Sequence, residues 1–407
     1  MAASHAIAEK IPAHVPSDIV WDNSFDTFTT ELGDPFLAIT RLHEQPGIIW
    51  ATDASYGRPG WILTRSDLIA EAFIDHAHFS SERPGMIADL IGVNMRLNPI
   101  EIDPPAHHGF RQILNPFFMP KAVKSLDDPV RKTCQDLIAK FADKGSCDFI
   151  EDFAVPFPSY VFLDLMGMPH DMLPKFLEWQ DGLMRGATMQ ARVDAAKAIY
   201  AYLEQFVEEQ RKNPTAALSK GIIEGQVGGH PMAHLEMMGM FYVLYVGGLD
   251  TVYSTLGWVM RHLAQHPELQ QRLRDNPDDL PAAIEEFTRA FSVVVTHRQV
   301  KEDFVFHGVQ MKKGEEVNLP ISLANRDPAV FENPDIVDID RKPRHINFGT
   351  GVHSCVGIHL AKRELRIVVE EFLKHFRNIR IKDGETYRYH TGRTFGIDYL
   401  PLTWDKA

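Results

Sequence analysis

The chain has 407 residues, of which 44% are hydrophobic, and a formal net charge of −13. These values are typical of a globular protein with a large core, and the acidic balance disfavours general binding to nucleic acids or anionic membranes. The sequence has no run of about 18 consecutive apolar residues, and residues 1–16 lack the apolar segment of a signal peptide. We therefore expect no membrane anchor and a cytoplasmic location.

The three cysteines are Cys134, Cys147 and Cys355. A sparse, odd number of cysteines is typical of a reducing compartment, and an iron–sulfur cluster held by cysteine alone would need four thiolates. No proline-, glycine- or serine-rich linker and no internal repeat divides the chain, so we expect a single domain over residues 1–407.

The N-terminal part of the chain predicts short elements. Residues 35–42 predict a short helix, and residues 47–52 and 60–64 alternate and carry isoleucine and tryptophan, which predicts a β-hairpin. Ser66 is expected to cap a helix that continues to about residue 76.

The region that follows predicts one long loop and then helices. Residues 78–99 show no sustained period, and a loop of this length in a compact domain is usually functional. A helix is expected to open at Asp103, which can cap it, with Pro104 and Pro105 in its first turn. Further helical patterns run to residue 142 and over 158–166, 172–184 and 191–212, and residues 221–231 break them.

An uninterrupted helical pattern between Pro231 and Pro267 could run about 50 Å. It contains the segment Gly-Gly-Leu-Asp-Thr at 247–251, and two interior glycines, at roughly 1 kcal/mol each, imply that another object approaches the backbone closely. The Thr251 hydroxyl can hydrogen-bond a ligand, or bond the carbonyl four residues back and so open the helix. Asp250 is well placed to relay protons. The alternative is a glycine-faced helix crossing with a satisfied threonine.

Two further segments carry chemistry. Glu286 and Arg289 are three residues apart on a predicted helix, so they share a face and can pair. Cys355 lies in the glycine-rich segment 348–357, directly before the apolar-periodic run 358–372. The start of a helix favours a thiolate, and glycines allow the tight turn that aims N–H groups at the sulfur.

The residues around Cys355 describe a haem site. Gly349 allows the turn, Gly357 leaves room for a large flat ligand, Phe348 can shield the sulfur, and His353 can reach an acidic group on the ligand's rim. The ligand that fits these features is haem held by a cysteine thiolate. The alternative is a buried structural cysteine near a turn.

The motifs F-x-x-G-x-H-x-C-x-G, D-P-P-x-H-x-x-x-R, G-G-L-D-T and E-x-x-R resemble those of the cytochrome P450 family, in the same order and over nearly the whole chain. The nearest resemblance is to the camphor-hydroxylase branch of its soluble class I members. It implies the P450 fold, a single triangular haem domain that is mainly α with small β-sheets, and haem b as the cofactor.

The resemblance also implies roles for single residues. Cys355 would ligate the iron, and Asp250 and Thr251 would form the oxygen-activating acid–alcohol pair. The Glu286–Arg289 pair would belong to a buried structural network that Arg341 completes. The implied haem-binding residues are Arg111, Gly248, Arg298, Phe348, Gly349, His353 and Gly357. The camphor branch has an aspartate where this chain has Thr296, beside the unusual His297, so we expect rearranged contacts to the haem propionates.

The substrate pocket is expected to be mostly apolar. Met95 falls where the camphor branch has a tyrosine that hydrogen-bonds the substrate ketone, and methionine has no hydroxyl donor. This argues against camphor and favours a compact monoterpenoid or norisoprenoid. The residues implied to line the pocket are Met86, Met95, Ile100, Val246, Val294 and Thr394, although ordinary core packing is an alternative for each.

The sequence therefore predicts a haem-thiolate monooxygenase that inserts one oxygen atom of O2 into a C–H bond of a small apolar substrate. No dinucleotide-binding fingerprint is present, so electrons must come from outside the chain. The resemblance implies a two-iron ferredoxin and an NADH-dependent ferredoxin reductase, and we expect a monomer. A basic patch for the ferredoxin could comprise His108, Arg111, Lys342 and Arg344.

Two alternative functions remain open. A peroxygenase that uses hydrogen peroxide would usually lack the pair formed by Asp250 and Thr251. A non-catalytic haem sensor should be joined to a signalling domain, and the sequence shows none.

Overall fold

The computed structural model describes residues 11–30, 33–55, 57–82 and 86–406. Helices dominate and the sheets are small, which confirms the predicted fold class. The chain forms two compact units, which we call the sheet unit (Met1–Ser81, Gly257–Cys355 and Thr386–Leu400) and the helical unit (Glu82–Leu256, Val356–Glu385 and Pro401–Ala407). That these units form one domain stays a prediction.

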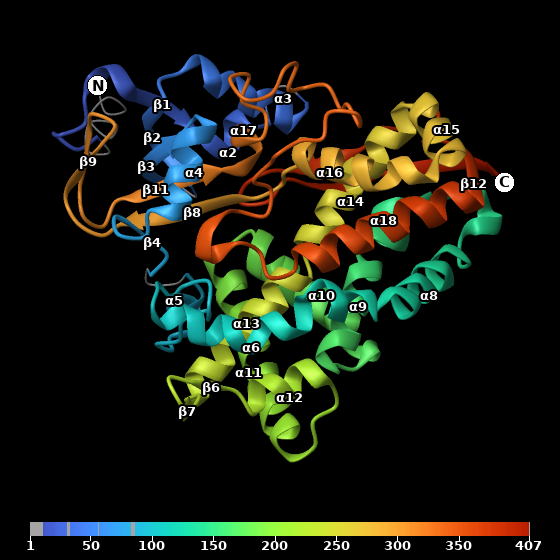
Figure 1. Cartoon of the computed structure of the whole chain (residues 1–407), viewed down its shortest axis with the longest axis horizontal. Helices are drawn as coiled ribbons and strands as arrows, with labels where there is room; N and C mark the ends of the chain where they lie inside the picture. The colour runs from blue at the N-terminus through green and yellow to red at the C-terminus, as the bar shows by residue number, and fades with distance from the viewer. Residues whose placement is uncertain (1–10, 31–32, 56, 83–85, 407) are drawn as a thin grey trace. The chain divides into compact units, whose positions relative to one another are not determined.

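The sheet unit contains a six-stranded sheet in the order β1-β2-β3-β11-β8-β4, whose strands can be followed in Figure 1. Two pairs of short strands, β9 with β10 and β13 with β14, complete its β-structure. The strands of the unit are β1 (Val20–Ser24), β2 (Ile48–Ser55), β3 (Arg58–Leu63), β4 (Phe79–Ser80), β8 (Val295–Val300), β9 (Phe304–Phe306), β10 (Val309–Met311), β11 (Glu316–Pro320), β13 (Arg388–His390) and β14 (Gly396–Tyr399).

The predicted hairpin is confirmed as the antiparallel pair β2 and β3. Trp50 and Trp61 face each other across it, with ring centroids 4.8 Å apart and ring planes at 80°. Both rings are buried in the core of this unit, so the pair holds the register of the hairpin by apolar packing.

The helices of the sheet unit are mostly short. The structure corrects the role of Ser66: it is the first residue of its helix rather than the cap, and its N–H donates to Asp327 Oδ2 at 2.8 Å. The helices are α2 (Phe25–Phe28), α3 (Pro35–Thr40), α4 (Ser66–Ile74), α15 (Pro267–Asp275), α16 (Leu280–Ala290) and α17 (Ile321–Ala324). The division between the units falls within α14 (Thr251–Gln265).

The helical unit holds the longer helices and a three-stranded sheet in the order β12-β15-β5. Its helices are α5 (Met86–Ile91), α6 (Ala106–Phe118), α7 (Pro120–Lys124), α8 (Asp127–Ile138), α9 (Pro156–Met166), α10 (Leu173–Arg185), α11 (Met189–Lys212), α12 (Ala217–Ile223), α13 (His234–Gly248) and α18 (Ile358–His375). Its strands are β5 (Ser146–Asp148), β6 (Gln226–Val227), β7 (His230–Pro231), β12 (Phe376–Ile381) and β15 (Pro401–Lys406).

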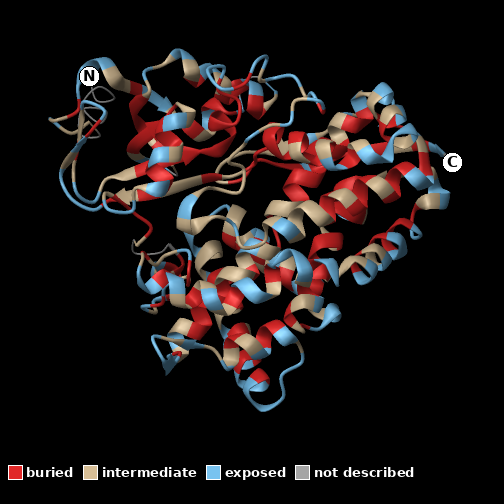
Figure 2. Ribbon diagram, viewed as in Figure 1, coloured by how far each residue is buried: buried red, intermediate tan, exposed pale blue. Residues whose placement is uncertain are grey.

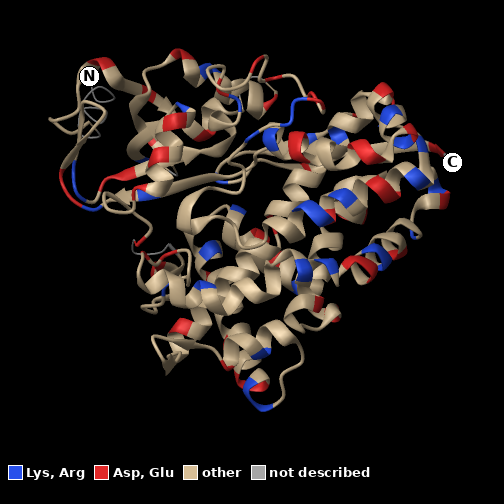
Figure 3. Ribbon diagram, viewed as in Figure 1, with Lys and Arg blue, Asp and Glu red and all other residues tan. Residues whose placement is uncertain are grey.

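Helix α18 shows how these helices pack. Most of its buried apolar residues share one side of the helix, and buried and exposed bands alternate along it in Figure 2. Basic and acidic residues also lie along the helix (Figure 3), and Arg131 of α8 bonds Glu370 at 3.0 Å as well as the buried Glu371. Apolar burial and cross-helix ion pairs therefore hold α18 against α8.

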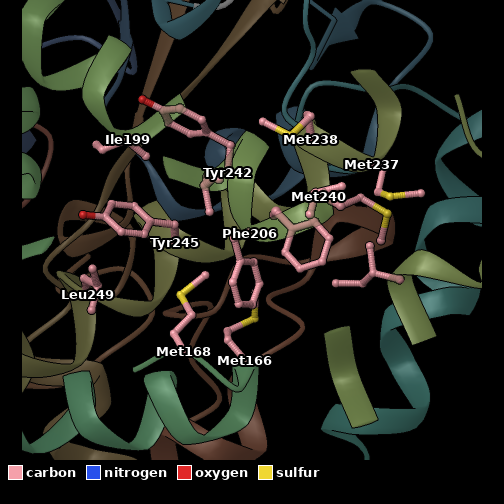
Figure 4. Packing of buried hydrophobic residues seen from close by; sticks show 14 of the residues in the cluster. Met166, Met168, Ile199, Phe206, Met237, Met238, Met240, Tyr242, Tyr245 and Leu249 are labelled. Carbon is pink, nitrogen blue, oxygen red and sulfur yellow. The ribbon is translucent and has the colours of Figure 1, made fainter. Parts of the chain in front are cut away.

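The core of the helical unit is rich in methionine and aromatic residues. Figure 4 shows Met166 of α9, Phe206 of α11 and three methionines of α13 (Met237, Met238 and Met240) gathered in this cluster. Methionine is unbranched and polarizable, so it fills irregular gaps between aromatic rings. The result is an apolar core that surrounds the middle of α13.

Three expectations need correction. The pattern over 231–267 is not one helix, because α13 ends at Gly248 and α14 begins at Thr251. Asp103 does not cap α6: Pro105 precedes the helix without a side-chain cap bond. The long loop over 78–99 contains β4 and α5. Within the described residues, no helix has the length and apolar character needed to cross a membrane.

Candidate active site

The cysteine loop, residues 348–357, is a tight turn held by backbone bonds. Gly349 and Gly351 have φ of +67° and +71°, values that a residue with a side chain rarely adopts. The N–H of Gly349 donates to the carbonyl of Ile346 at 2.8 Å, and the N–H of Cys355 donates to the carbonyl of Phe348 at 2.8 Å. The predicted tight turn is therefore present: the bond from Cys355 closes it, and α18 begins three residues after Cys355.

Cys355 differs from the other two cysteines in its environment. It is exposed, whereas Cys134 is buried and Cys147 is half-buried. Burial raises the pKa of the Cys134 thiol and of the Cys147 thiol, and nearby carboxylates raise both further. A thiolate, the form that ligates iron, is therefore disfavoured at these two positions, and Cys355 is the cysteine suited to that role.

The remaining predicted residues of the loop lie at its two ends. Phe348 is half-buried, and its ring lies 6.3 Å from the ring of His345. His353 ends a 3₁₀ turn over Gly351–His353, and Gly357 directly precedes α18, where its carbonyl accepts from Ala361 N–H at 2.9 Å. Cys355 thus lies between two turns of fixed backbone.

The buried network predicted from E-x-x-R is confirmed, including its third member. Glu286 and Arg289 are both fully buried and pair through Nη2–Oε1 at 2.6 Å and Nε–Oε2 at 2.8 Å. Arg341 joins them, with its Nε 3.2 Å from Glu286 Oε1. This bidentate geometry, with backbone carbonyls on the remaining Arg289 donors, satisfies a charge pair that burial would otherwise penalise.

A chain of hydrogen bonds connects this network to the cysteine loop. Arg289 Nη1 donates to the carbonyl of Asn325 at 2.9 Å, and Asn325 Oδ1 accepts from the N–H of Ile346 at 2.9 Å. The carbonyl of Ile346 in turn accepts from Gly349 at the start of the loop. The buried ion pair therefore helps to fix the position of the loop, as well as stabilising the sheet unit.

Arg298 lies on β8 and is 6% exposed. Its guanidinium carbon lies 5.2 Å from the centroid of the Phe73 ring, and Nη1 donates to the carbonyl of His297 at 2.9 Å. Side chains alternate along a strand, so Thr296 shares the face of Arg298 and His297 points to the opposite face. An aspartate at position 296 would have lain on the arginine's own face, where this chain has a neutral hydroxyl.

Two predicted pocket residues of the sheet unit form an antiparallel bridge, Val294 with Thr394. Val294 is half-buried and Thr394 is 9% exposed. The structure thus brings these two residues together, although they are far apart in the sequence.

Three hydroxyl groups bond backbone carbonyls at the break between α13 and α14 and in the first turn of α14. Thr251 Oγ1 donates to the carbonyl of Gly247 at 3.4 Å, as the sequence suggested, and Ser254 and Thr255 likewise donate to the carbonyls of Asp250 and Thr251 at 2.9 and 3.0 Å. Such bonds compete with the helical N–H groups for the same carbonyls. The contact from Thr251 is the longest of the three, so its hydroxyl can exchange partners most readily.

The two glycines of the break serve different purposes. A methyl group at Gly247 would meet nothing within 4 Å, so the helix faces open space there. A methyl group at Gly248 would overlap the ring of Phe162 from α9. The prediction that both glycines clear room for a ligand is therefore supported at Gly247 only, because the space beside Gly248 is filled by an aromatic ring.

Asp250 is buried and its carboxylate is held from two sides. Arg185 Nη1 of α10 and the hydroxyl of Tyr253 each donate to Asp250 Oδ1 at 3.1 Å. Burial alone would lower the pKa of Arg185, but Tyr253 and the carboxylates of Asp250 and Asp181 reverse this and raise it. The sequence missed Arg185 and Tyr253, because a single arginine and a tyrosine in helical patterns carry no distinctive signal.

The other predicted pocket residues belong to the helical unit. Met95 is 2% exposed in the apolar cluster, and Val246 is half-buried against the same cluster. Ile100 is 53% exposed. Met86 is the first residue of α5, and its side chain lies outside the described residues.

Arg111 lies on α6 one turn after His107, so the two side chains share a face. Arg111 is half-buried. Burial lowers the pKa of His107 to about 4, and the positive charges of Arg111 and His108 contribute to this. Of the residues expected to form a basic patch, His108, Lys342 and Arg344 are exposed.

The described residues suit haem rather than an iron held by side chains alone. No group of three or more histidine, cysteine, aspartate or glutamate side chains in the described ranges could hold a metal ion. Haem needs only one axial protein ligand, because the porphyrin supplies the other four. Cys355 is the exposed cysteine, and its role as that ligand stays a prediction, as do the roles of Arg111 and Arg298 toward acidic groups on the macrocycle.

Comparisons with known proteins agree with this chemistry. The family model for Cytochrome P450 matches residues 158–391, more than half of the chain. The chain is 35% identical over 404 residues to a probable cytochrome P450 127A1 of Sinorhizobium fredii, with 97% of each chain covered. It is 32% identical over 293 residues to a steroid C26-monooxygenase of Mycolicibacterium smegmatis, covering 70% of this chain and 73% of that protein.

Among solved structures, the crystal structure of CYP101J2 is similar with a TM-score of 0.87 at 30% identity, and the match covers 97% of this chain and 99% of that chain. The shared fold, the length of the match and the geometry of the cysteine loop agree with one another. The chain therefore belongs to the cytochrome P450 family, and it is a haem-iron monooxygenase, as its sequence motifs predict.

Proposed function

We propose that this enzyme inserts one atom of dioxygen into a C–H bond of a small apolar substrate, of the monoterpenoid or norisoprenoid class. The observation that best supports this class is the open space beside Gly247, next to Val246, in a unit whose core is apolar and rich in methionine. Met95 belongs to the same cluster and offers no hydroxyl donor to a substrate ketone. A hydrocarbon-rich ligand suits such a lining better than a polar one.

In this proposal Cys355 is the axial ligand of the haem iron, and Arg111, Arg298 and His353 bind the propionates. Phe348, Gly349, Gly357 and Gly248 are the further haem-binding residues of this proposal. When bound, the haem supplies the reductive activation of dioxygen, which protein side chains cannot perform. The residues of the chain hold the group, exclude water and deliver protons.

Proton delivery is assigned to Asp250 and Thr251. The long contact from Thr251 to the Gly247 carbonyl, 3.4 Å, leaves its hydroxyl able to turn towards a ligand or a water molecule. Asp250 lies directly before it and is 2% exposed. Its carboxylate is anchored by Arg185 and Tyr253, so it can accept a proton only in a fixed place.

The residues proposed to contact the substrate are Met86, Met95, Ile100, Val246, Val294 and Thr394. A ligand that reaches Ile100 would cover a side chain that is now 53% exposed. We also propose that the enzyme is a cytoplasmic monomer, that residues 1–407 form one domain, and that it is related to the camphor-hydroxylase branch.

Electrons are proposed to come from NADH through a ferredoxin reductase and a two-iron ferredoxin. The exposed side chains of His108, Lys342 and Arg344, with the half-buried Arg111, supply positive charge for an acidic ferredoxin. This charge stands out because the chain as a whole is acidic. Added salt should therefore slow reduction by the ferredoxin.

The test is reconstitution with NADH, reductase and ferredoxin, after a panel of terpenoids has been screened for a haem spin-state shift. We expect oxygenated product from a monoterpenoid or norisoprenoid only when all three electron-transfer components are present. Thr251→Ala should keep the haem but divert electrons into hydrogen peroxide. Product formed equally well from peroxide alone would favour a peroxygenase, and haem binding with no turnover of any panel member would favour a sensor.

A further inference from the structure

The segment that carries Met95 lies directly on α13 at a single glycine. A methyl group at Gly239 would overlap the carbonyl oxygen of Arg96 and would lie 3.3 Å from the N atom of Asn98. Gly239 is buried in the interior of α13, where glycine costs roughly 1 kcal/mol relative to alanine. Glycine is needed here because the backbone of Arg96 packs directly against the backbone of α13, and a side chain at position 239 would prevent this contact.

A second contact fixes the same segment one helical turn away. The side-chain amide of Asn98 donates to the carbonyl of Glu236 at 2.9 Å, and Asn98 is 2% exposed. Glu236 and Gly239 are three residues apart, so they lie on one face of α13. We call these two contacts, at Gly239 and at Glu236, the α13 clamp.

The clamp determines how far Met95 lies from the proposed pocket residue Val246. Val246 follows Gly239 by seven residues, which places it on nearly the same face of α13 and about 10 Å further along the axis. Met95 directly precedes Arg96, the residue whose carbonyl touches Gly239. The contact at Gly239 therefore sets the distance between the segment that carries Met95 and α13. Val246, and Gly247 with the open space beside it, lie further along the same helix.

We infer that Gly239 is a specificity-determining position: through the α13 clamp it limits the size of the substrate that fits between Met95 and Val246. This inference rests on the proposed function, in which Met95 and Val246 contact the substrate. Gly239 itself is a positioning residue, because it acts through the 95–98 segment. A residue with a side chain at 239 lifts that segment and widens the space.

The test compares Gly239→Ala with a matched control, Gly182→Ala. The control adds the same methyl group inside α10 of the same unit, where it meets the methyl group of Ala195 at 3.0 Å rather than a backbone carbonyl. Asn98→Ala is a second variant, which loosens the clamp without adding volume and so serves if Gly239→Ala fails to fold.

The first measurement is amide hydrogen exchange, which does not depend on turnover. Gly239→Ala and Asn98→Ala should speed exchange in a peptide covering residues 93–102, and Gly182→Ala should not. The second measurement is the haem spin-state titration with limonene, a monoterpene without a ketone, as a small probe and β-ionone as a larger one. The ratio of the limonene Kd to the β-ionone Kd should rise about tenfold in Gly239→Ala, the scale of one methyl group in an apolar pocket.

Each result decides a different part of the inference. Unchanged exchange over 93–102 would overturn the clamp itself. Faster exchange with an unchanged Kd ratio would overturn its role in specificity. A wild-type protein that showed no spin-state shift with any terpenoid would instead refute the substrate class in the proposed function, while the exchange data would still decide whether the clamp exists.

Discussion

The cysteine loop and the α13–α14 break are both glycine-rich, but they are held in different ways. The loop is fixed mainly by backbone bonds between near neighbours, such as Cys355 N–H to the Phe348 carbonyl. The break depends on side chains that are distant in sequence: Arg185 bonds Asp250, and the Phe162 ring fills the space beside Gly248. Short-range geometry thus holds Cys355, the proposed iron ligand, whereas tertiary packing holds Asp250, which is proposed to deliver protons.

The largest effect is expected from a substitution in the cysteine loop. Cys355→Ser should abolish the long-wavelength absorbance of the reduced carbon monoxide complex, because the hydroxyl cannot replace thiolate donation to the iron. Absorption spectroscopy measures this directly. Cys147→Ser is the control and should keep the band. Cys147 lies on β5, opposite Leu402 of β15 in the three-stranded sheet, and not in the cysteine loop. A retained band in the Cys355 variant would move the iron ligand elsewhere.

The buried ion pair gives the next largest effect. Arg289→Ala leaves Glu286 charged and buried, so we expect a loss of about 3–5 kcal/mol in the free energy of unfolding and poorer haem retention. Urea denaturation with haem quantification measures both. Arg272→Ala breaks the partly exposed pairs with Asp279 and Asp340 and should cost far less, because solvent screens these charges. Equal losses in the two variants would mean that the loop does not depend on the buried network.

The paired glycines sharpen the comparison within the break. Gly248→Ala forces a methyl group into the Phe162 ring and should destabilise the protein by about 1–3 kcal/mol. Gly247→Ala meets open space, so its unfolding free energy should stay the same or rise by up to about 1 kcal/mol, as expected for alanine in a helix. Thermal unfolding of both variants measures the difference, and equal stabilities would contradict the assignment of Phe162.

The effect that is smallest at neutral pH is a pH dependence at His107. Its pKa falls from about 6.5 in the unfolded chain to about 4 in the folded protein, because it is buried near Arg111 and His108. The unfolded state then binds more protons between these values, so the stabilisation is complete above pH 6.5 and is lost as the pH falls towards 4.

His107→Gln should flatten this part of the stability curve, measured by urea denaturation from pH 4 to 7. The exposed His108→Gln is the control and should leave most of the slope in place. If the slope is the same in both variants, other groups must titrate in this range.

Much of the site could be predicted because its signals are local. The tight turn at Gly349, the bond from Thr251 to the carbonyl four residues back, and the pairing of Glu286 with Arg289 each involve residues that are close in sequence. The prediction of one helix over 231–267 was wrong, because the apolar pattern continues through the break between α13 and α14. Hydrophobic periodicity indicates which face of a helix is buried. It does not indicate whether a backbone carbonyl bonds a helical N–H or a side-chain hydroxyl.

The sequence by itself determined the family, the mainly helical fold class and the order of the motifs, because each of these depends on residue types at fixed short spacings. Only the tertiary structure decided that Gly248 makes room for Phe162, that Arg185 and Tyr253 hold Asp250, and that Gly239 receives the backbone of Arg96. Most of these contacts join segments that are far apart in the chain. Which residues meet is decided by close packing in the folded protein, and a local sequence pattern carries no information about it.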